Sequence, residues 1–249
     1  MRRNLEDAAV LYRQELESLQ LIAAPAVVLG PLLVIIAAGG LPVALATIPA
    51  FLVLYLLSYA ACVSAAGAAL HNSEPTLGAC YADALRCAPV LARLAAPAGL
   101  LLAGVFGAAL VLSDIGFGYV GALFGLLGAG AGLFWASRHA YDQPLVILHE
   151  ATADEATEVS DSFSRDETAG TLLFLGAVAL PLVPVLLLSW ALGAALLPIV
   201  GAGLFVLVLA LWLPFAALAL TIACGRMIEE ATRQPEPAPT SQTGYARPR

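Results

Sequence analysis

Long apolar runs alternate with shorter polar segments along the whole chain, and the apolar runs have the length of membrane spans. Residues 21–70 are apolar almost throughout and are interrupted only at Gly39-Gly40-Leu41-Pro42. Because one helical span needs about 20 residues, this region predicts two spans joined by a tight turn. The same reasoning over the rest of the chain predicts six spans in total, at about 21–38, 43–69, 91–112, 115–138, 169–190 and 196–224.

The polar segments carry a second pattern, in which apolar residues recur every three or four positions. In the N-terminal segment this spacing places Leu5, Tyr12 and Leu16 on one helical face, which predicts a helix lying on the membrane surface. The two connectors predict further surface helices, at about 75–88 and 153–165. The chain therefore divides into an N-terminal amphipathic helix, one membrane domain, and a helix end with a disordered tail, at 1–20, 21–225 and 226–249.

Composition strengthens the membrane assignment. Hydrophobic residues make up 61% of the chain and charged residues only 12%, whereas charged residues form about 25% of ordinary soluble domains. The formal net charge of −7 lies in the polar segments, so it describes exposed loops and argues against a nucleic-acid partner. We therefore expect an all-α fold, a polytopic membrane helix bundle.

The arginine positions predict the side of the membrane on which each segment lies. All 11 basic residues are arginines, and the predicted turns that contain none are 39–42, 113–118 and 191–197. Since positively charged residues concentrate in cytoplasmic segments, both termini and both connectors are predicted to be cytoplasmic. The chain is then a multi-pass protein of the cell (plasma) membrane, arranged as three outward hairpins.

The predicted fourth span carries glycines three and four residues apart, which places them on one stripe of a helix. A stripe without side chains lets neighbouring membrane helices approach closely. These residues predict a helix-packing seam, at Gly118, Gly121, Gly125, Gly128 and Gly132. On this interpretation, Gly125→Leu disrupts the bundle.

Prolines predict two breaks in the helices. Pro181 and Pro184 lie near the middle of the fifth span, so we expect a kink there. Residues 115–150 would extend about 54 Å as one helix, which is too long for a straight span. Pro144 therefore predicts a bend near the cytoplasmic surface.

The second connector opens with the signature of a helix start. Thr152-Ala-Asp-Glu155 is a capping box, in which the threonine hydroxyl and the glutamate carboxylate satisfy free backbone N–H groups. In the helix that follows, the spacing places Ala156 and Ser160 toward the membrane or the bundle and Asp161 outward.

Both connectors also resemble known proteins. The first matching stretch is E-P-T-L-G-A-C-Y-A-D-A-L-R at residues 74–86, and the second holds Pro144, Thr152, Glu155, Ala156, Ser160 and Arg165. They resemble a broad family of uncharacterised six-helix prokaryotic integral membrane proteins (a domain of unknown function) and, more distantly, the membrane domain of glycerophosphodiester phosphodiesterase. The resemblance covers roughly residues 50–230 and implies a fold and a membrane location, but no activity. His149 stands where that family has a glutamate, and Glu150 follows one position later.

Candidate metal ligands lie at the cytoplasmic end of the fourth span. His139 and Asp142 are three residues apart and share a helix face, and His149 and Glu150 follow on the same side of the membrane. Histidine and carboxylate side chains are ligands for zinc, which could activate water. The other interpretation is that these polar residues mark the point where the helix leaves the lipid.

The sequence favours no reaction. It contains no Gly-x-Ser-x-Gly, P-loop, His-Glu-x-x-His or Cys-x-x-Cys motif, and the predicted spans lack the ionisable groups that mark transport pathways. We therefore expect a non-enzymatic membrane scaffold or accessory subunit, without a cofactor, that presents its cytoplasmic helices to a protein partner or to lipid headgroups. A small-molecule or lipid transporter or channel is the first alternative, and a metal-dependent membrane enzyme is the second.

Overall fold

The computed structural model describes residues 2–37, 39–166, 168–195 and 198–233, and the predicted tail at 234–249 lies outside these ranges. The described residues form ten α-helices and no β-strand, which confirms the predicted all-α fold. In chain order the helices are α1 (Arg2–Gln14), α2 (Leu16–Ala37), α3 (Leu41–Leu70), α4 (Leu77–Asp114), α5 (Gly118–Arg138), α6 (Asp142–His149), α7 (Ala153–Asp166), α8 (Thr168–Ala179), α9 (Leu182–Ala195) and α10 (Pro198–Arg233).

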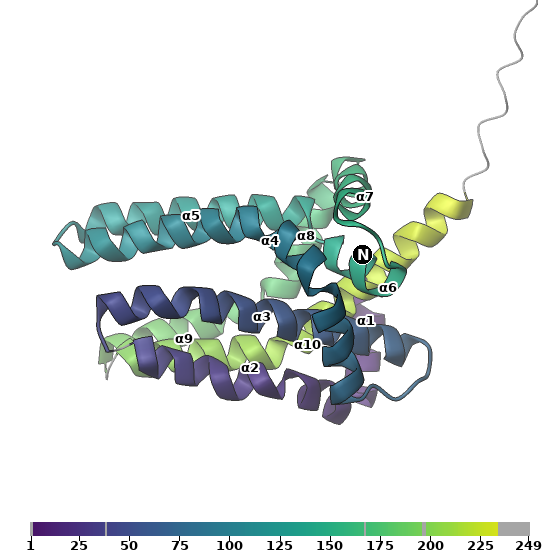
Figure 1. Cartoon of the computed structure of the whole chain (residues 1–249), viewed down its shortest axis with the longest axis horizontal. Helices are drawn as coiled ribbons and strands as arrows, with labels where there is room; N and C mark the ends of the chain where they lie inside the picture. Colours follow the sequence, from purple (N-terminus) through teal and green to yellow (C-terminus); the bar gives the residue numbers. More distant parts are fainter. Residues whose placement is uncertain (1, 38, 167, 196–197, 234–249) are drawn as a thin grey trace, which may run out of the picture.

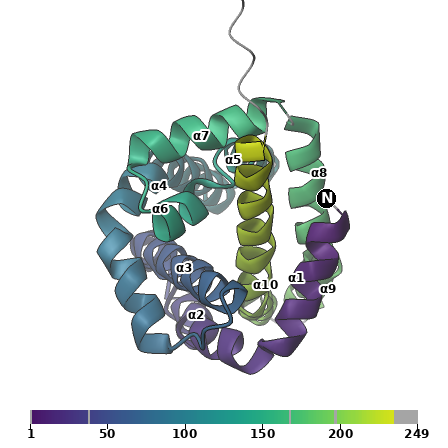
Figure 2. The ribbon, with the colours of Figure 1, turned by 90° about the vertical axis from the view of Figure 1, so that its right-hand side faces the viewer.

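The long helices run along the long axis of the molecule, and the short helices gather at one end (Figure 1). α2, α3, α9 and α10 lie together, while α4 and α5 form a hairpin beside them. α1, α6 and α7 lie at the end that holds the N-terminus and the last turns of α10, and this end is seen face-on in Figure 2. We name it the terminal face.

Several helices have the length and composition needed to cross a membrane. Three segments qualify alone, at Leu16–Ala37, Leu45–Leu70 and Val200–Thr232. α8 and α9 qualify as a pair that is bent by 49°. The bend falls at Leu180 and Pro181, as the prolines of this region predict, because proline lacks a backbone N–H and its ring clashes with the preceding turn. The chain is thus a helical membrane bundle, and its described residues include three or four such segments.

Large apolar side chains remain exposed on the long helices. The exposed fraction is 97% for Tyr119, 75% for Leu100 and 72% for Leu126. Soluble monomers rarely leave large apolar patches uncovered, whereas lipid tails solvate such side chains as well as a protein interior does. The buried core lies instead toward the terminal face, and its largest fully buried members include Leu19, Ile22, Val63, Leu91, Val146 and Leu218.

The first connector differs from the prediction. The expected surface helix at 75–88 and the expected span at 91–112 form one continuous helix, α4, which contains Pro89 and Pro97. Its first turns bury Cys80 and Ala84, and Leu91 follows in the same core. Tertiary packing on both sides of Pro89 therefore keeps the helix intact, although each proline removes one backbone hydrogen bond.

The break after the fourth predicted span also lies elsewhere than expected. α5 ends at Arg138 and α6 begins at Asp142, so the chain turns before Pro144. Pro144 occupies the first turn of α6, where its missing N–H costs no helical hydrogen bond. The proline starts the short helix, and the turn itself is made by residues 139–141.

The predicted glycine seam is divided in the structure. Gly121 and Gly128 are buried and Gly132 is partly buried, but a Cβ atom on Gly118 or Gly125 would meet no atom within 4 Å. Around Gly125 there is thus open space for a Cβ atom, and the disruption expected of the larger Gly125→Leu substitution stays a prediction. A close backbone approach lies instead at Gly201, where an added Cβ would overlap the carbonyl oxygen of Ser189.

Candidate functional site

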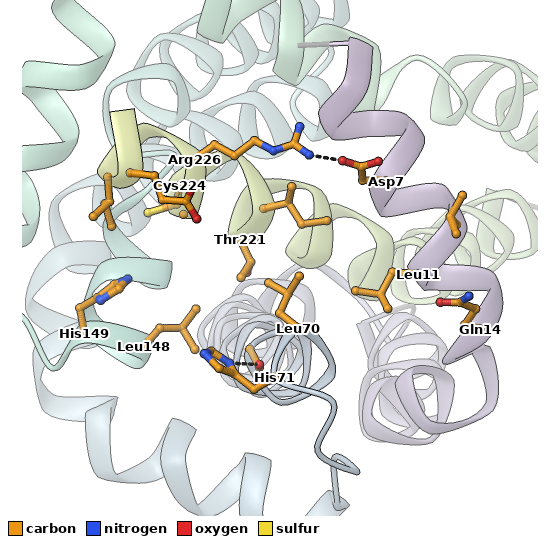
Figure 3. A pocket seen from close by; sticks show the side chains of 16 residues that line it. Asp7, Leu11, Gln14, Leu70, His71, Leu148, His149, Thr221, Cys224 and Arg226 are labelled. Carbon is orange, nitrogen blue, oxygen red and sulfur yellow. Dashed lines mark hydrogen bonds and ion pairs between the residues drawn. The ribbon is translucent and has the colours of Figure 1, made fainter. Parts of the chain in front are cut away.

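A large cavity opens at the terminal face, between α1, α3, α6 and α10 (Figure 3). Its volume is about 920 Å³, which lies within the range of roughly 300–1,000 Å³ typical of ligand sites. Apolar and polar side chains both line it, including Leu11, Leu70, Leu148, Ile222, Asp7, Gln14, His71, His149, Thr221 and Arg226. We name it the terminal cavity.

An ion pair joins the first and last helices along one edge of the terminal cavity. The Arg226 guanidinium donates hydrogen bonds to the Asp7 carboxylate and to the Asn4 side chain. Figure 3 shows the Arg226 side chain reaching across from α10 to Asp7 on α1. Because the two side chains are 31% and 46% exposed, solvent weakens their attraction. The pair gives this edge of the cavity both a positive and a negative charge.

Two histidines lie on the opposite side of the cavity, with Leu148 between them (Figure 3). His71 follows the end of α3, and its Nδ1 lies 2.8 Å from the Gly67 carbonyl oxygen. A carbonyl oxygen only accepts, so Nδ1 carries the proton and Nε2 of the neutral ring is left as an acceptor. His149 is the last residue of α6 and is exposed.

Close packing on α3 holds α6 beside this cavity. A Cβ atom on Gly67 would overlap Leu148 Cδ2, so only a glycine admits the leucine at this distance. After α6, Glu150 adopts the left-handed conformation with φ 53°, and its N–H bonds to the Leu145 carbonyl oxygen. The Glu150 carboxylate then lies 3.5 Å from the exposed Arg86 guanidinium.

A smaller cavity of about 160 Å³ lies at the N-terminal end of α6, whereas the terminal cavity is lined by the C-terminal end of this helix. His139 and Asp142 form a pair at its wall, with 2.9 Å between Nδ1 and Oδ2. The His139 ring stacks on Trp135 with 4.6 Å between ring centroids. Asp142 is only 2% exposed, and this burial raises the pKa of its carboxyl group, against the opposing influence of His139. We name this space the dyad cavity.

The structure separates the four candidate metal ligands into two groups. His139 and Asp142 line the dyad cavity, whereas His149 lines the terminal cavity and Glu150 pairs with Arg86. The separation follows from α6 itself, since seven helical residues rise about 10 Å. In the described part of the chain, no three His, Cys, Asp or Glu side chains are grouped to hold a metal ion.

The predicted capping box is present at the start of α7. The Thr152 N–H donates to Glu155 Oε2 at 2.9 Å, and the Glu155 N–H lies 3.4 Å from Thr152 Oγ1. The first of these hydrogen bonds is the main reason that the pKa of Glu155 is lowered. Glu155 is exposed and has a structural role as the cap of this helix.

The other residues of the connector motif attach α7 to the end of α5. Ala156 is fully buried, and the Ser160 hydroxyl donates to the Arg138 carbonyl oxygen at 2.9 Å while lying 3.4 Å from the Tyr141 nitrogen. Asp161 does not point outward as predicted. It bonds to Arg138 and to Arg165, each at 2.6 Å, and the Arg138 bond is the leading cause that lowers its pKa.

The first connector is anchored in the same manner. Tyr81 shares a hydrogen bond of 3.0 Å with Ser58 and donates to the Ile22 carbonyl oxygen at 3.2 Å. Asp83 accepts a hydrogen bond of 2.8 Å from Ser64. Tyr81 and Asp83 thus hold α4 against α2 and α3.

Sequence reasoning missed the terminal cavity, because its lining comes from four helices that are far apart in the chain. Arg226, Thr221 and Asp7 have no shared motif. One signal was available: all three histidines were predicted on the cytoplasmic side, and two of them, His71 and His149, line this cavity. A comparison with protein-family models, curated proteins and solved structures finds no match to this chain.

Proposed function

We propose that this protein is a six-span membrane scaffold or accessory subunit without enzymatic activity, which acts through its terminal face by binding lipid headgroups. In this proposal, α2–α3, α4–α5 and α8/α9–α10 are three outward hairpins, and the terminal face and both chain ends lie in the cytoplasm. The proposed orientation follows the arginines, which are absent from the three predicted outer turns.

The terminal cavity is the observation that carries this proposal. It lies where apolar helices meet polar ends, and its lining is apolar at Leu11 and Leu148 but charged at Asp7 and Arg226. An amphiphile matches such a lining, because its acyl part covers the apolar wall and its headgroup meets the charged edge. Since that edge carries both signs of charge, a zwitterionic phospholipid fits it better than an anionic one.

The test is photo-crosslinking of a diazirine-bearing phosphatidylethanolamine to the purified chain in nanodiscs, followed by mapping of the labelled peptides. We expect labelling at α1, α6 and the C-terminal part of α10. Gly225 lines the cavity and has no atom within 4 Å of an added Cβ, so Gly225→Leu fills the cavity without a backbone clash. This variant should lose most of the labelling.

The matched control is Gly176→Leu on α8, which also has open space at the added Cβ but does not line the cavity. It should be labelled at the terminal face as strongly as the parent. Equal labelling of the parent and Gly225→Leu would refute lipid binding in this cavity. Stronger labelling by a phosphatidylglycerol probe would refute the zwitterionic preference.

A protein partner would bind the outer side of α7. Asp161 is engaged internally, but Glu158 and Asp154 are exposed. A photo-reactive residue at position 158 should capture one defined neighbour in the native host, while the same residue at the lipid-facing position Leu126 should not. Capture of no defined protein at position 158 contradicts this part of the proposal.

Transport is the alternative that one observation favours. Asp142 is ionisable and buried in the bundle beside His139, and such groups mark ion and proton pathways in membrane proteins. Proteoliposomes with a trapped pH-sensitive dye test this directly. If the parent protein dissipates an imposed pH gradient and the Asp142→Asn variant does not, proton transport is established. Equal leakage from empty liposomes would exclude proton transport.

A further inference from the structure

We infer that the dyad cavity is a binding site for a small organic cation with a primary ammonium group, with Asp142 as the counter-ion and Trp135 as an aromatic wall. The site is separate from the terminal cavity, and the inference does not depend on lipid binding there.

The cavity is bounded by residues from α3, α4, α5, α6, α8 and α10 together with the α5–α6 turn, so it lies where most of the bundle converges. Its volume of about 160 Å³ is close to that of cavities of ~150 Å³ that hold benzene. A ligand of about six heavy atoms or fewer therefore fits. This size excludes a phospholipid headgroup with its glycerol and acyl chains.

Three residues that line this cavity each carry a buried oxygen atom without a hydrogen-bond partner among the described residues: Tyr59 Oη, Asp142 Oδ1 and Gln143 Oε1. The Ser160 hydroxyl also lies within hydrogen-bonding reach of the Asp142 carboxylate and lowers its pKa, although the hydroxyl is 2.9 Å from the Arg138 carbonyl oxygen, to which it donates. Folded proteins satisfy nearly all buried polar atoms, with protein groups, ordered water or ligands. The three oxygens mark a place where something outside the chain belongs.

These three oxygen atoms are hydrogen-bond acceptors, so the ligand must carry hydrogen-bond donors. A carboxylate oxygen and an amide oxygen only accept hydrogen bonds, and a tyrosine hydroxyl is able to accept one. A primary ammonium group brings three N–H donors, which equals the number of unpartnered oxygens. A quaternary ammonium has no N–H and would leave all three unpaired.

The charges around the cavity select a cation. No arginine is among the described residues that line it, and Asp142 is its only carboxylate. Arg138 bonds to Asp161 on α7, and Arg93, which adjoins the lining residue Leu94, is exposed. His139 also lines the cavity and is paired with Asp142. The faces of Trp135 and Tyr59 also attract positive charge, because the ring faces carry negative potential.

The experiment is calorimetric titration of the full chain in nanodiscs with n-propylammonium, with 1-propanol as the neutral isostere and tetramethylammonium as the cation without donors. We expect saturable binding of n-propylammonium only. Asp142→Asn should weaken it by about tenfold or more, because the negative charge that strengthens the hydrogen bond from the ammonium group is lost. Tyr59→Phe should weaken it by roughly threefold to tenfold.

Tyr55→Phe is the matched control. It removes a hydroxyl from the same helix, but the Tyr55 hydroxyl bonds to the Val206 carbonyl oxygen at 2.9 Å and does not line the cavity. Its affinity should equal that of the parent. If Asp142→Asn fails to fold, the comparison of Tyr59→Phe with Tyr55→Phe decides the question.

Three results would overturn the inference: no saturable binding, which leaves ordered water as the occupant; equal binding of 1-propanol, which removes the role of charge; or equal binding of tetramethylammonium, which removes the role of the donors. An unchanged affinity in Tyr59→Phe would place the bound cation outside the dyad cavity.

Discussion

The Arg138 guanidinium lies 2.6 Å from the Asp161 carboxylate, and this ion pair connects the last residue of α5 to the middle of α7. The two side chains are 29% and 30% exposed, so the contact is better protected from solvent than a typical surface pair. Asp161 also bonds to Arg165 one turn later at 2.6 Å, but Arg165 is 73% exposed. The Arg138–Asp161 pair, and not the more exposed Arg165–Asp161 pair, therefore attaches α7 to α5.

Arg138→Ala should loosen α7 from the bundle. We expect amide hydrogen exchange in α7 to become several-fold faster, because the ion pair that connects it to α5 is lost. Arg165→Ala is the control: it removes only the more exposed pair and should change exchange far less. Equal effects of the two variants would show that the Arg138 contact has no special role.

Substitution of two glycines should distinguish a position in close backbone contact from a position on the predicted helix-packing seam that has open space. Gly201→Ala forces a Cβ atom against the backbone carbonyl of Ser189, and such overpacking typically costs about 1–3 kcal/mol. Gly125→Ala meets open space and should be neutral or stabilising by up to about 1 kcal/mol, through helix propensity. Thermal unfolding in detergent measures the stability of both variants. A destabilised Gly125→Ala variant would show that another residue or molecule packs against the seam at this position.

Two tyrosines one turn apart on α3 should respond oppositely to loss of the hydroxyl. Tyr55→Phe removes the hydrogen bond to Val206 and should cost about 1 kcal/mol of unfolding free energy. Tyr59→Phe removes a buried hydroxyl without a partner among the described residues, and in the absence of ligand it should be neutral or slightly stabilising. Chemical denaturation of the two variants checks this, and a larger loss for Tyr59→Phe would contradict it.

Asp142 should make stability fall as pH rises. Burial raises its pKa above the ordinary 3.8, so over the interval between 3.8 and the raised value the folded state keeps a proton that the unfolded state has lost. The carboxyl group therefore favours folding most below pH 3.8 and less at higher pH. Asp142→Asn does not titrate, so the stability difference between variant and parent should shift toward the variant from pH 3.5 to 7. A difference that is independent of pH would contradict the burial of this group.

The local features of this chain could be derived from its sequence. The helical fold and the span-length apolar segments follow from the composition and from the spacing of apolar residues. The capping box follows from the three-residue spacing of Thr152 and Glu155. The kink at Pro181 follows from a missing backbone N–H. Each depends on interactions within a few residues, which a linear pattern records directly.

Tertiary structure decided which distant residues meet. The pattern grouped His139 with His149, but α6 places them in different cavities, and Asp161 turned inward because Arg138 lies opposite it. Gly125 and Gly201 both lie within apolar stretches, yet only Gly201 has a backbone against it. These outcomes depend on how helices pack in three dimensions, and the periodicity of a single helix contains no information about the neighbour it will face.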